Sequence, residues 1–231
     1  LLIPTCEEVF HIARAYAKLS EHCTVFCASL DVLRGLHSKF TFNQSARDLG
    51  LPAPDTWLVT DRDQLLDFLH VAGPDLVFKP EYSRFATHVV IGPRTGRDVD
   101  QIAPTPENAW VVQERLTGRH ICTFSTAHAG RVTAHTTYAS EITAGSAAVH
   151  FEHIDHAEAV EWVKRFVEGK ALSGQLSFDF IEVPGRDLLP LECNPRITSG
   201  LHLFEDSARI TNAYLDPAAP HVTPHIGSSA M

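Results

Sequence analysis

The chain has 231 residues, of which 44% are apolar and 20% charged, a composition typical of a folded globular protein with a sizeable core. Its formal net charge of −9 argues against a broad surface for nucleic-acid backbones, because such surfaces need clustered cations. No apolar run reaches the roughly 20 residues that span a bilayer. From the charge we expect no nucleic-acid partner, and from the apolar runs no membrane partner.

The first 36 residues indicate a short βαβ-like piece. Residues 1–3 and 23–27 have strand character, and apolar residues at helical spacing predict a helix over 7–19. Because the chain starts abruptly at Leu1, without an initiator methionine, we expect it to be a fragment of a longer protein. The five cysteines of the chain are scattered and odd in number, which favours a reducing, cytoplasmic location.

Helices and strands then alternate along the chain. One helix is predicted through Leu36 after an N-cap at Ser29 or Asp31, and a second over 38–49 that ends at Gly50. Further helices are predicted over 61–71 and 157–170. Strands are predicted over 55–60, 76–79, 87–91, 109–114, 121–127, 132–138, 175–182 and 187–193. Such a mixture of strands with flanking helices predicts an α+β fold.

Three segments carry less regular patterns. Residues 140–149 are small, which indicates a mobile loop, and the proline-rich segment 217–224 indicates a tail. The histidines at 150, 153 and 156 share a helix face only in part, so we interpret them as solvated side chains and not as metal ligands.

The most informative segment is 175–196, where Pro184 and Gly185 predict the turn of a β-hairpin. A turn centred between Gly185 and Arg186 sets the register of the two strands. It pairs Asp179 with Glu192, Ser177 with Asn194, Phe178 with Cys193, and Phe180 with Leu191.

This register predicts a magnesium site. Glu192, Asn194 and Arg196 project to one side of their strand because strand side chains alternate. Two directly opposed carboxylates, Asp179 and Glu192, are destabilising unless a cation lies between them. Mg²⁺ prefers such oxygen ligands together with phosphate oxygens. The alternative is an exposed hairpin face that carries two solvated acids.

Two lysines are candidate phosphate ligands. Lys79 ends an apolar strand and Lys39 opens the helix over 38–49, and two point charges opposite an acid-bound cation suit a polyphosphate. Residues 111–118 predict a strand that runs into a tight turn, whose backbone groups could hydrogen-bond a purine edge.

The order of these motifs resembles the ATP-grasp superfamily, in particular its carbamoyl-phosphate-synthetase-like and biotin-carboxylase-like carboxylate–amine ligases. The segments that carry the resemblance are 38–40, 49–54, 77–80, 113–118, 178–180 and 192–200. The last two are the most specific.

The resemblance implies a role for each candidate residue. Lys39 and Lys79 would contact the phosphates of ATP, and residues Gln113, Glu114 and Leu116 would bind adenine. Asp179, Glu192 and Asn194 would hold one or two Mg²⁺ ions. Arg196 would steady the acyl phosphate or carboxylate, which makes Arg196 and Lys79 the candidate catalytic residues. The loop after Lys79 lacks the glycines usual in the family, so Ser83, Arg84 or Thr87 would substitute for them.

The resemblance also implies a domain organisation and an activity. Residues 1–36 would end a pre-ATP-grasp domain, 37–115 would form the small subdomain and lid, and 116–231 would form the large subdomain with the metal-binding hairpin. We expect a ligase that joins a small-molecule carboxylate to an amine through an acyl phosphate. The alternatives are a bicarbonate-activating enzyme, of the carboxylase or carbamoyl-phosphate-synthetase kind, and a non-catalytic ATP-binding module. The two substrates and the oligomeric state, a homo-oligomer included, stay open.

Overall fold

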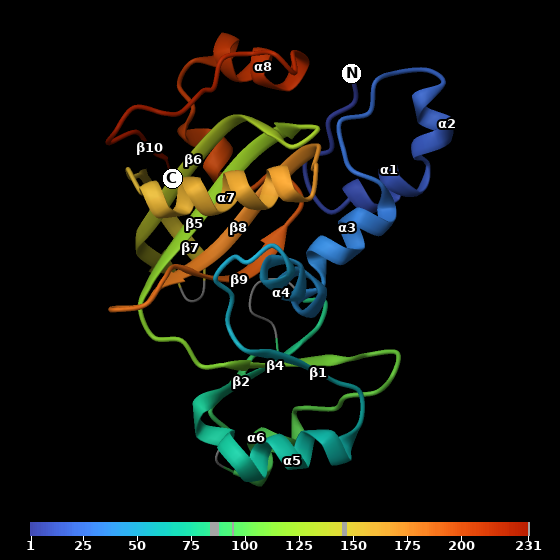
Figure 1. The fold of residues 1–231 in the computed structure, drawn as a ribbon, viewed down its shortest axis with the longest axis vertical. Helices are drawn as coiled ribbons and strands as arrows, with labels where there is room; N and C mark the ends of the chain where they lie inside the picture. Colours follow the sequence, from blue (N-terminus) through green and yellow to red (C-terminus); the bar gives the residue numbers. More distant parts are fainter. Residues whose placement is uncertain (84–87, 94, 145–146, 231) are drawn as a thin grey trace.

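The structure is a computed structural model that describes residues 1–83, 88–93, 95–144 and 147–230. It contains two antiparallel sheets, one of four strands and one of six, with helices on their outer faces and an N-terminal helical segment beside the larger sheet (Figure 1). This arrangement confirms the predicted α+β class. Within the described ranges, no helix is long and apolar enough to cross a bilayer.

The N-terminal segment is mostly helical. Two short helices, α1 (Val9–Arg14) and α2 (Tyr16–Ser20), replace the single helix predicted over 7–19, because the backbone at Ala15 departs from helical geometry. The two predicted strands meet only as one isolated parallel bridge, between Leu2 and Val25.

Helices α3 (Leu30–His37) and α4 (Lys39–Asp48) both begin at a serine. The side chains of Ser29 and Ser38 each accept a hydrogen bond from the backbone N–H three residues further on, which confirms Ser29 as an N-cap. Helix α4 is followed by Gly50, whose φ of 66° lies in the left-handed region that glycine adopts without strain. The predicted end of this helix is therefore correct, and the Ser38 cap places Lys39 at the first helical position.

The smaller sheet has the strand order β1-β4-β2-β3. Its strands are β1 (Thr56–Val59), β2 (Leu76–Pro80), β3 (Val90–Ile91) and β4 (Trp110–Glu114). Helices α5 (Arg62–Ala72) and α6 (Gly96–Asp100) cover one face, over an apolar core built around Phe78, Trp110 and Val112. A short 3-10 turn, η1 (Gly73–Asp75), leads from α5 into β2. Because strand side chains alternate, Lys79 and Gln113 lie on the opposite face, which is turned toward α4 and the larger sheet (Figure 1).

The larger sheet has the strand order β10-β7-β6-β5-β8-β9. Its strands are β5 (Arg119–His128), β6 (Arg131–Ala144), β7 (Ala147–His153), β8 (Gly174–Glu182), β9 (Leu189–Asn194) and β10 (Ser229–Ala230). Helix α7 (Ala157–Gly169) lies across one face of this sheet (Figure 1). Every strand pair is antiparallel, so neighbouring strands place directly opposed residues on the same face.

An aromatic cluster joins α4, α7 and β8 into one core. Trp162 stacks on Phe166 with ring centroids 5.1 Å apart, and Phe178 and Phe180 of β8 pack edge-on against Trp162. Phe42 of α4 stacks on Phe178 at 5.8 Å. All of these rings except Trp162, which is 3% exposed, are fully buried. The core fixes the apolar face of β8, so that the residue between the two phenylalanines projects to the other face.

Two segments predicted to be irregular are ordered in part. Most of 140–149 belongs to the hairpin of β6 and β7, which contradicts the predicted loop, although residues 145–146 lie outside the described ranges. The predicted tail is wrong as well. Helix α8 (Ser207–Leu215) precedes it, and Val222, only 4% exposed, bridges to Ala134 of β6 and packs there with α8.

Candidate active site

The hairpin of β8 and β9 has the predicted register at its polar end. Ser177 pairs with Asn194, Phe178 with Cys193, and Asp179 with Glu192. The prediction for Phe180 is wrong, because a bulge follows Asp179 and places Phe180 opposite Pro190 and not Leu191. On the turn side of the bulge the pairing is one residue off the prediction, and the bulge restores the predicted register at the carboxylates.

The two acids of this hairpin share a hydrogen-bonding partner. The Asn194 side-chain amide donates to Asp179 Oδ2 at 3.3 Å and to Glu192 Oε1 at 3.4 Å. Burial and the neighbouring charge of Glu192 raise the pKa of Asp179 to about 7. Burial also acts to raise the pKa of Glu192, but the charges of Lys39 and Lys79 outweigh it and lower that pKa. Asp179 and Glu192 are therefore not two solvated acids, which excludes the alternative of an exposed hairpin face.

Lys39 reaches the acids from the start of α4. Its Nζ lies 3.4 Å from Glu192 Oε2 and donates to the Ser83 carbonyl at 3.2 Å. The side chain is 3% exposed, and burial lowers its pKa. The loop that contains Ser83 is tied to α4 a second time, because Ser38 Oγ donates to Glu81 Oε1 at 2.5 Å. Of the predicted phosphate-loop residues, Ser83 therefore lies beside Lys39, whereas Arg84 and Thr87 lie outside the described ranges.

Lys79 lies on the inner face of the smaller sheet. It is buried, and its Nζ donates to Gln113 Oε1 at 2.9 Å. The amide nitrogen of Gln113 in turn donates to Thr56 Oγ1 at 3.0 Å. Burial lowers the pKa of Lys79 to about 8, although the acids Glu192 and Asp179 act to raise it. The side chain of Gln113 thus orients a lysine, a contact that its sequence motif does not reveal.

The segment that joins the two sheets has few free backbone donors. Glu114 N donates to Asp55 O at 2.9 Å, and Arg115 N donates to Asp75 O at 2.8 Å. Among the described residues, the N–H groups of Leu116, Thr117 and Gly118 have no hydrogen-bond acceptor, so they are the donors left for a ligand. The Glu114 carboxylate is also engaged, by a two-point ion pair with Arg186 at 2.9 and 3.1 Å. Arg186 follows the hairpin turn, and no motif in the sequence indicates this pairing.

Gly118 follows the same segment and packs against the larger sheet. A Cβ atom at this position would meet the Glu182 carbonyl oxygen at 2.1 Å, closer than any real contact. Only glycine allows this approach of β5 to β8, which brings the connection close to the hairpin.

Arg196 lies just beyond β9 and is held on three sides. Its Nε lies 2.9 Å from Glu7 Oε1, Nη1 donates to Ile197 O at 3.1 Å, and Nη2 donates to Asn194 Oδ1 at 3.3 Å. The amide of Asn194 therefore presents its nitrogen to the acids and its oxygen to Arg196. Glu7 comes from the opposite end of the chain, and no spacing in the sequence connects it to Arg196.

A row of ionisable side chains crosses the larger sheet at the level of the acids. Direct strand pairing places Glu192, Asp179, Cys122, Tyr138 and His153 at consecutive positions on one face. Burial raises the pKa of the Cys122 thiol well above its ordinary value, and the charge of Asp179 adds to this effect. Sequence reasoning missed Cys122 and Tyr138, because their relation to Asp179 depends on the pairing of distant strands.

The loop after Arg196 is fixed on this row by hydroxyl groups. Thr198 Oγ1 lies 2.9 Å from Ser177 Oγ and 3.2 Å from the Tyr138 hydroxyl. Gly200 packs on the same surface, since a Cβ there would meet the Tyr138 and Phe124 side chains at 2.6 and 2.7 Å. The loop therefore holds a fixed position next to the acids.

The predicted solvation of the histidines is wrong for two of them. His153 is 5% exposed, and its Nδ1 lies 3.0 Å from the Thr137 carbonyl oxygen, to which it donates, and 3.0 Å from Thr136 Oγ1. His156 caps α7 by accepting from Ala159 N, and its other ring nitrogen lies 3.4 Å from Glu182. Both histidines have structural partners.

The donor set limits what kind of metal could bind. In residues 1–83, 88–93, 95–144 and 147–230, no three His, Cys, Asp or Glu side chains converge to hold a metal by themselves. Two opposed carboxylates remain, Asp179 and Glu192, which suit an oxygen-preferring cation that completes its shell with water and phosphate oxygens. The residues therefore fit Mg²⁺ and fit poorly with a closed structural zinc site.

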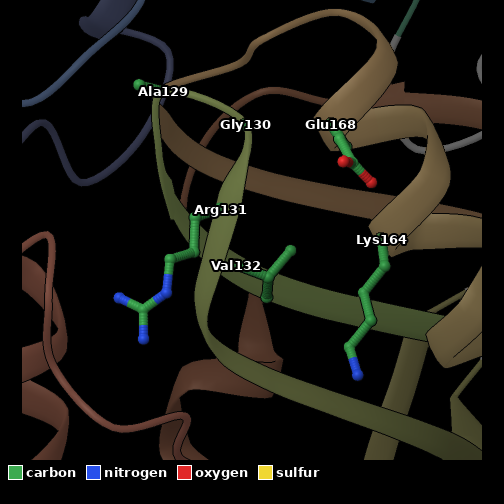
Figure 2. A pocket seen from close by; sticks show the side chains of 6 residues that line it. All are labelled: Ala129, Gly130, Arg131, Val132, Lys164 and Glu168. Carbon is green, nitrogen blue, oxygen red and sulfur yellow. The ribbon is translucent and has the colours of Figure 1, made fainter.

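A surface hollow lies elsewhere on the molecule. About 400 Å³ in volume, it is lined by the β5–β6 turn and by Lys164 and Glu168 of α7 (Figure 2). In Figure 2 the Arg131 side chain points away from the two α7 residues, and its guanidinium donates to the Pro217 and Ala219 carbonyls. This hollow therefore gathers fewer chemical groups than the hairpin, which we take as the candidate site.

Comparison with known proteins finds similarity at the level of structure. No family model matches the sequence, and no curated protein matches it. The chain is similar to a phosphoribosylamine–glycine ligase from Thermotoga maritima, with a TM-score of 0.72 and 14% identity, over 90% of this chain and 61% of that one. It is also similar to an N5-carboxyaminoimidazole ribonucleotide synthetase from Thermus thermophilus, with a TM-score of 0.67 and 15% identity, over 94% and 60%.

A third similar structure is the biotin carboxylase domain of a 2-oxoglutarate carboxylase from Hydrogenobacter thermophilus, in complex with MgADP, ADP and bicarbonate. The TM-score is 0.71 and the identity 12%, over 93% of this chain and 52% of that one. The chain thus spans between about half and three fifths of these structures. At such identities the likeness establishes the fold.

Proposed function

We propose that this chain, which has the ATP-grasp fold, is the nucleotide-binding part of a Mg²⁺-dependent ligase that joins a carboxylate to an amine. The proposed reaction has two steps. A carboxylate oxygen attacks the γ-phosphorus of ATP, and ADP leaves. The amine then attacks the acyl phosphate, and inorganic phosphate leaves as the C–N bond forms.

One observation carries this proposal: two buried lysines and two carboxylates from different parts of the chain converge. Lys39 Nζ lies 3.4 Å from Glu192, and the pKa of Lys79 responds to both Glu192 and Asp179. Phosphoryl transfer asks a protein mainly for positioning and for neutralisation of charge. Lysines on one side and an acid-bound cation on the other supply both.

Mg²⁺ would be held by Asp179 and Glu192. When bound, it would neutralise phosphate charge and orient the transferred group. Asn194 supports the acids by donating to both of them. It would become a ligand itself only if its amide turned over and released Arg196, since its oxygen now faces that residue.

The nucleotide would lie between the two sheets. Lys79 would reach a phosphate with Gln113 holding its side chain in place. The Leu116 N–H is the donor that we assign to the purine edge, with Glu114 bracing the connection through Arg186. In this assignment Gln113 and Glu114 act on the nucleotide indirectly. Ser83 would act by holding Lys39 at the phosphate loop.

Arg196 would steady the carboxylate and its acyl phosphate. Its planar guanidinium suits two-point recognition of an oxyanion, and it lies next to Asn194 and the acids. Lys79 and Arg196 are therefore the proposed catalytic residues, the first on ATP and the second on the acceptor.

The proposed subdomain boundaries follow the two sheets. We propose that residues 37–115 form the small subdomain and lid, that 116–231 form the large subdomain, and that 1–36 end a preceding domain. Because the chain spans little more than half of the similar structures, the remaining acceptor contacts would come from outside it. All five cysteines are thiols and none forms a disulfide, which supports a cytoplasmic location.

Activation of bicarbonate is the second candidate. It is favoured by the likeness to a biotin carboxylase domain whose structure contains MgADP and bicarbonate. The chemistry at the acids would be the same, with bicarbonate as the oxygen nucleophile.

Calorimetric titration with MgATP, followed by ADP release with bicarbonate, single amino acids and amino acid–amine pairs, tests the proposal. We expect binding, and release that one carboxylate class stimulates. Binding without turnover on any carboxylate favours the non-catalytic module, and the absence of binding contradicts the proposal altogether.

A further inference from the structure

We propose that Glu7 is a positioning residue for Arg196, and that residues 1–37 thereby form part of the acceptor side of the site. The inference rests on the proposed function for the role of Arg196, but the contact itself does not. It assigns a function to a segment that the metal and nucleotide chemistry leaves unused.

The ion pair is shielded on both sides. Arg196 Nε lies 2.9 Å from Glu7 Oε1, and the two side chains are 14% and 27% exposed. Both carboxylate oxygens of Glu7 are closed off from solvent. A buried charge that loses its partner is strongly destabilised, so each member of this pair restrains the other.

A continuous set of contacts holds Glu7 in place. Glu7 lies in the turn that starts α1, where its carbonyl accepts from Phe10 N at 3.2 Å. Val9 of α1 packs in one apolar cluster with Leu33 of α3, and both are 2% exposed. Helix α3 ends at His37, whose ring packs on Phe10 of α1 with the ring centroids 5.3 Å apart, and α3 itself contacts β9. The segment is thus docked on β9, beside the acids.

The pair determines which edge of the guanidinium faces the site. Glu7 lies at the Nε edge of the guanidinium. Nη1 donates one N–H to Ile197 O, and Nη2 donates one N–H to Asn194 Oδ1. Each terminal nitrogen carries a second N–H, and among the described residues none accepts from it. These two donors form the edge that suits a carboxylate or an acyl phosphate. Because its own oxygens are shielded, Glu7 acts through Arg196 and does not touch the substrate.

The first test observes Arg196 directly and needs no ligand. Its Nε–H resonance is assigned in ¹⁵N-labelled protein by its loss in Arg196→Lys. In Glu7→Gln we expect a shifted Nε–H signal and exchange with water that is about tenfold faster or more, the scale of about 1.4 kcal/mol. Glu7→Asp should restore part of the protection. The matched control is Glu21→Gln, an exposed acid of the same segment, which should leave the signal unchanged.

The second test measures the site with acetyl phosphate as the probe. In the reverse of the proposed first step, a β-phosphate oxygen of MgADP attacks the phosphorus of acetyl phosphate, and acetate leaves as ATP forms. We expect Glu7→Gln to raise the KM for acetyl phosphate by about tenfold or more, as misplacement by about 1 Å can do. The Kd of MgADP should change less than about twofold, well under 1.4 kcal/mol.

Each result has a definite meaning. An unchanged Nε–H signal in a folded Glu7→Gln protein overturns the inference, whatever the enzyme does. Equal fold increases in the Kd of MgADP and in the KM for acetyl phosphate also overturn it. They indicate that Glu7 only stabilises the fold and does not position Arg196. If the wild-type protein binds no MgADP, the proposed function fails, and the Nε–H signal still decides the role of Glu7.

Discussion

The Nζ atom of Lys39, at the first residue of α4, lies 3.4 Å from Oε2 of Glu192, on the edge strand of the larger sheet. This contact brings together a helix that follows the N-terminal segment and a hairpin near the other end of the sequence. With Lys79 and Asp179 nearby, it concentrates two positive and two negative groups in one buried region. Burial is the largest effect on the pKa of Lys39, Lys79 and Asp179, and the charge of Glu192 acts to raise each of these three pKa values.

Gln113→Leu should weaken MgATP binding. The variant leaves the Lys79 ammonium without the acceptor that it contacts at 2.9 Å, so the side chain is no longer directed at a phosphate. We expect a loss of about 1–2 kcal/mol, the scale of one hydrogen bond to a charged group. Calorimetric titration of the variant measures this. Gln101→Leu, at an exposed position after α6, is the control, and equal affinities in all three proteins contradict the role of Gln113.

Asp179→Asn should stabilise the ligand-free protein at pH 8 but not at pH 4. The folded pKa of about 7 exceeds the ordinary value of 3.8, so folding favours the protonated acid. Its stabilising contribution is complete below pH 3.8 and is lost as pH rises through about 7. The asparagine removes this loss. Urea unfolding at pH 4 and pH 8 measures the free energy of unfolding, with Asp187→Asn in the exposed turn as the control. An Asp179→Asn protein that is less stable than the wild type at pH 8 contradicts this prediction.

His135 should make the fold sensitive to acid. Its ring is buried on β6 between Ser125 and Thr137, and burial lowers its pKa from 6.5 to about 3. Since the folded protein holds the neutral ring, the contribution to stability is complete above pH 6.5 and is lost as pH falls toward about 3.

Replacement by glutamine should flatten this dependence. We expect the free energy of unfolding of His135→Gln to change less between pH 6.5 and about 4 than that of the wild type, when measured by urea titration. His120→Gln, at an exposed position of β5, should keep the wild-type slope. Identical slopes in His135→Gln and the wild type contradict the assignment.

Gly118→Ala should destabilise the protein by about 2 kcal/mol or more, because the added carbon meets a carbonyl oxygen of β8 and the backbone must move. Gly96→Ala is the matched control, since a Cβ there meets nothing within 4 Å. Thermal unfolding of the two variants compares them. A Gly118→Ala protein as stable as the control means that β5 and β8 are not in close contact at this point.

The local features of the fold could be predicted from the sequence. Caps and glycines specify the ends of α4, and the predicted pairing of Asp179 with Glu192 is correct, although it depends on a bulge between these acids and the turn. The prediction failed at the next pair, where Pro190 has no N–H for a ladder hydrogen bond and Leu191 is the extra residue of a bulge. Local rules do not show how far such a disruption extends.

The tertiary part of the site could not be predicted in this way. Cys122 and Tyr138 come next to Asp179 only because β5 pairs with both β6 and β8, and that order is set by the packing of the whole sheet. Glu7 reaches Arg196 through the docking of α1 on α3. The proline-rich end looked like a tail because proline breaks regular structure, although Val222 between those prolines is buried against β6.

The metal claim is tested most directly with Mn²⁺ in place of Mg²⁺, by following the binding of Mn–ADP through electron paramagnetic resonance. The comparison is between the wild type and the double variant Asp179→Asn, Glu192→Gln. We predict that the wild type binds Mn²⁺ together with ADP, and that the double variant stays folded but leaves the metal in solution. Equal Mn²⁺ binding by both proteins would contradict the assignment of these two acids as the ligands of the catalytic metal.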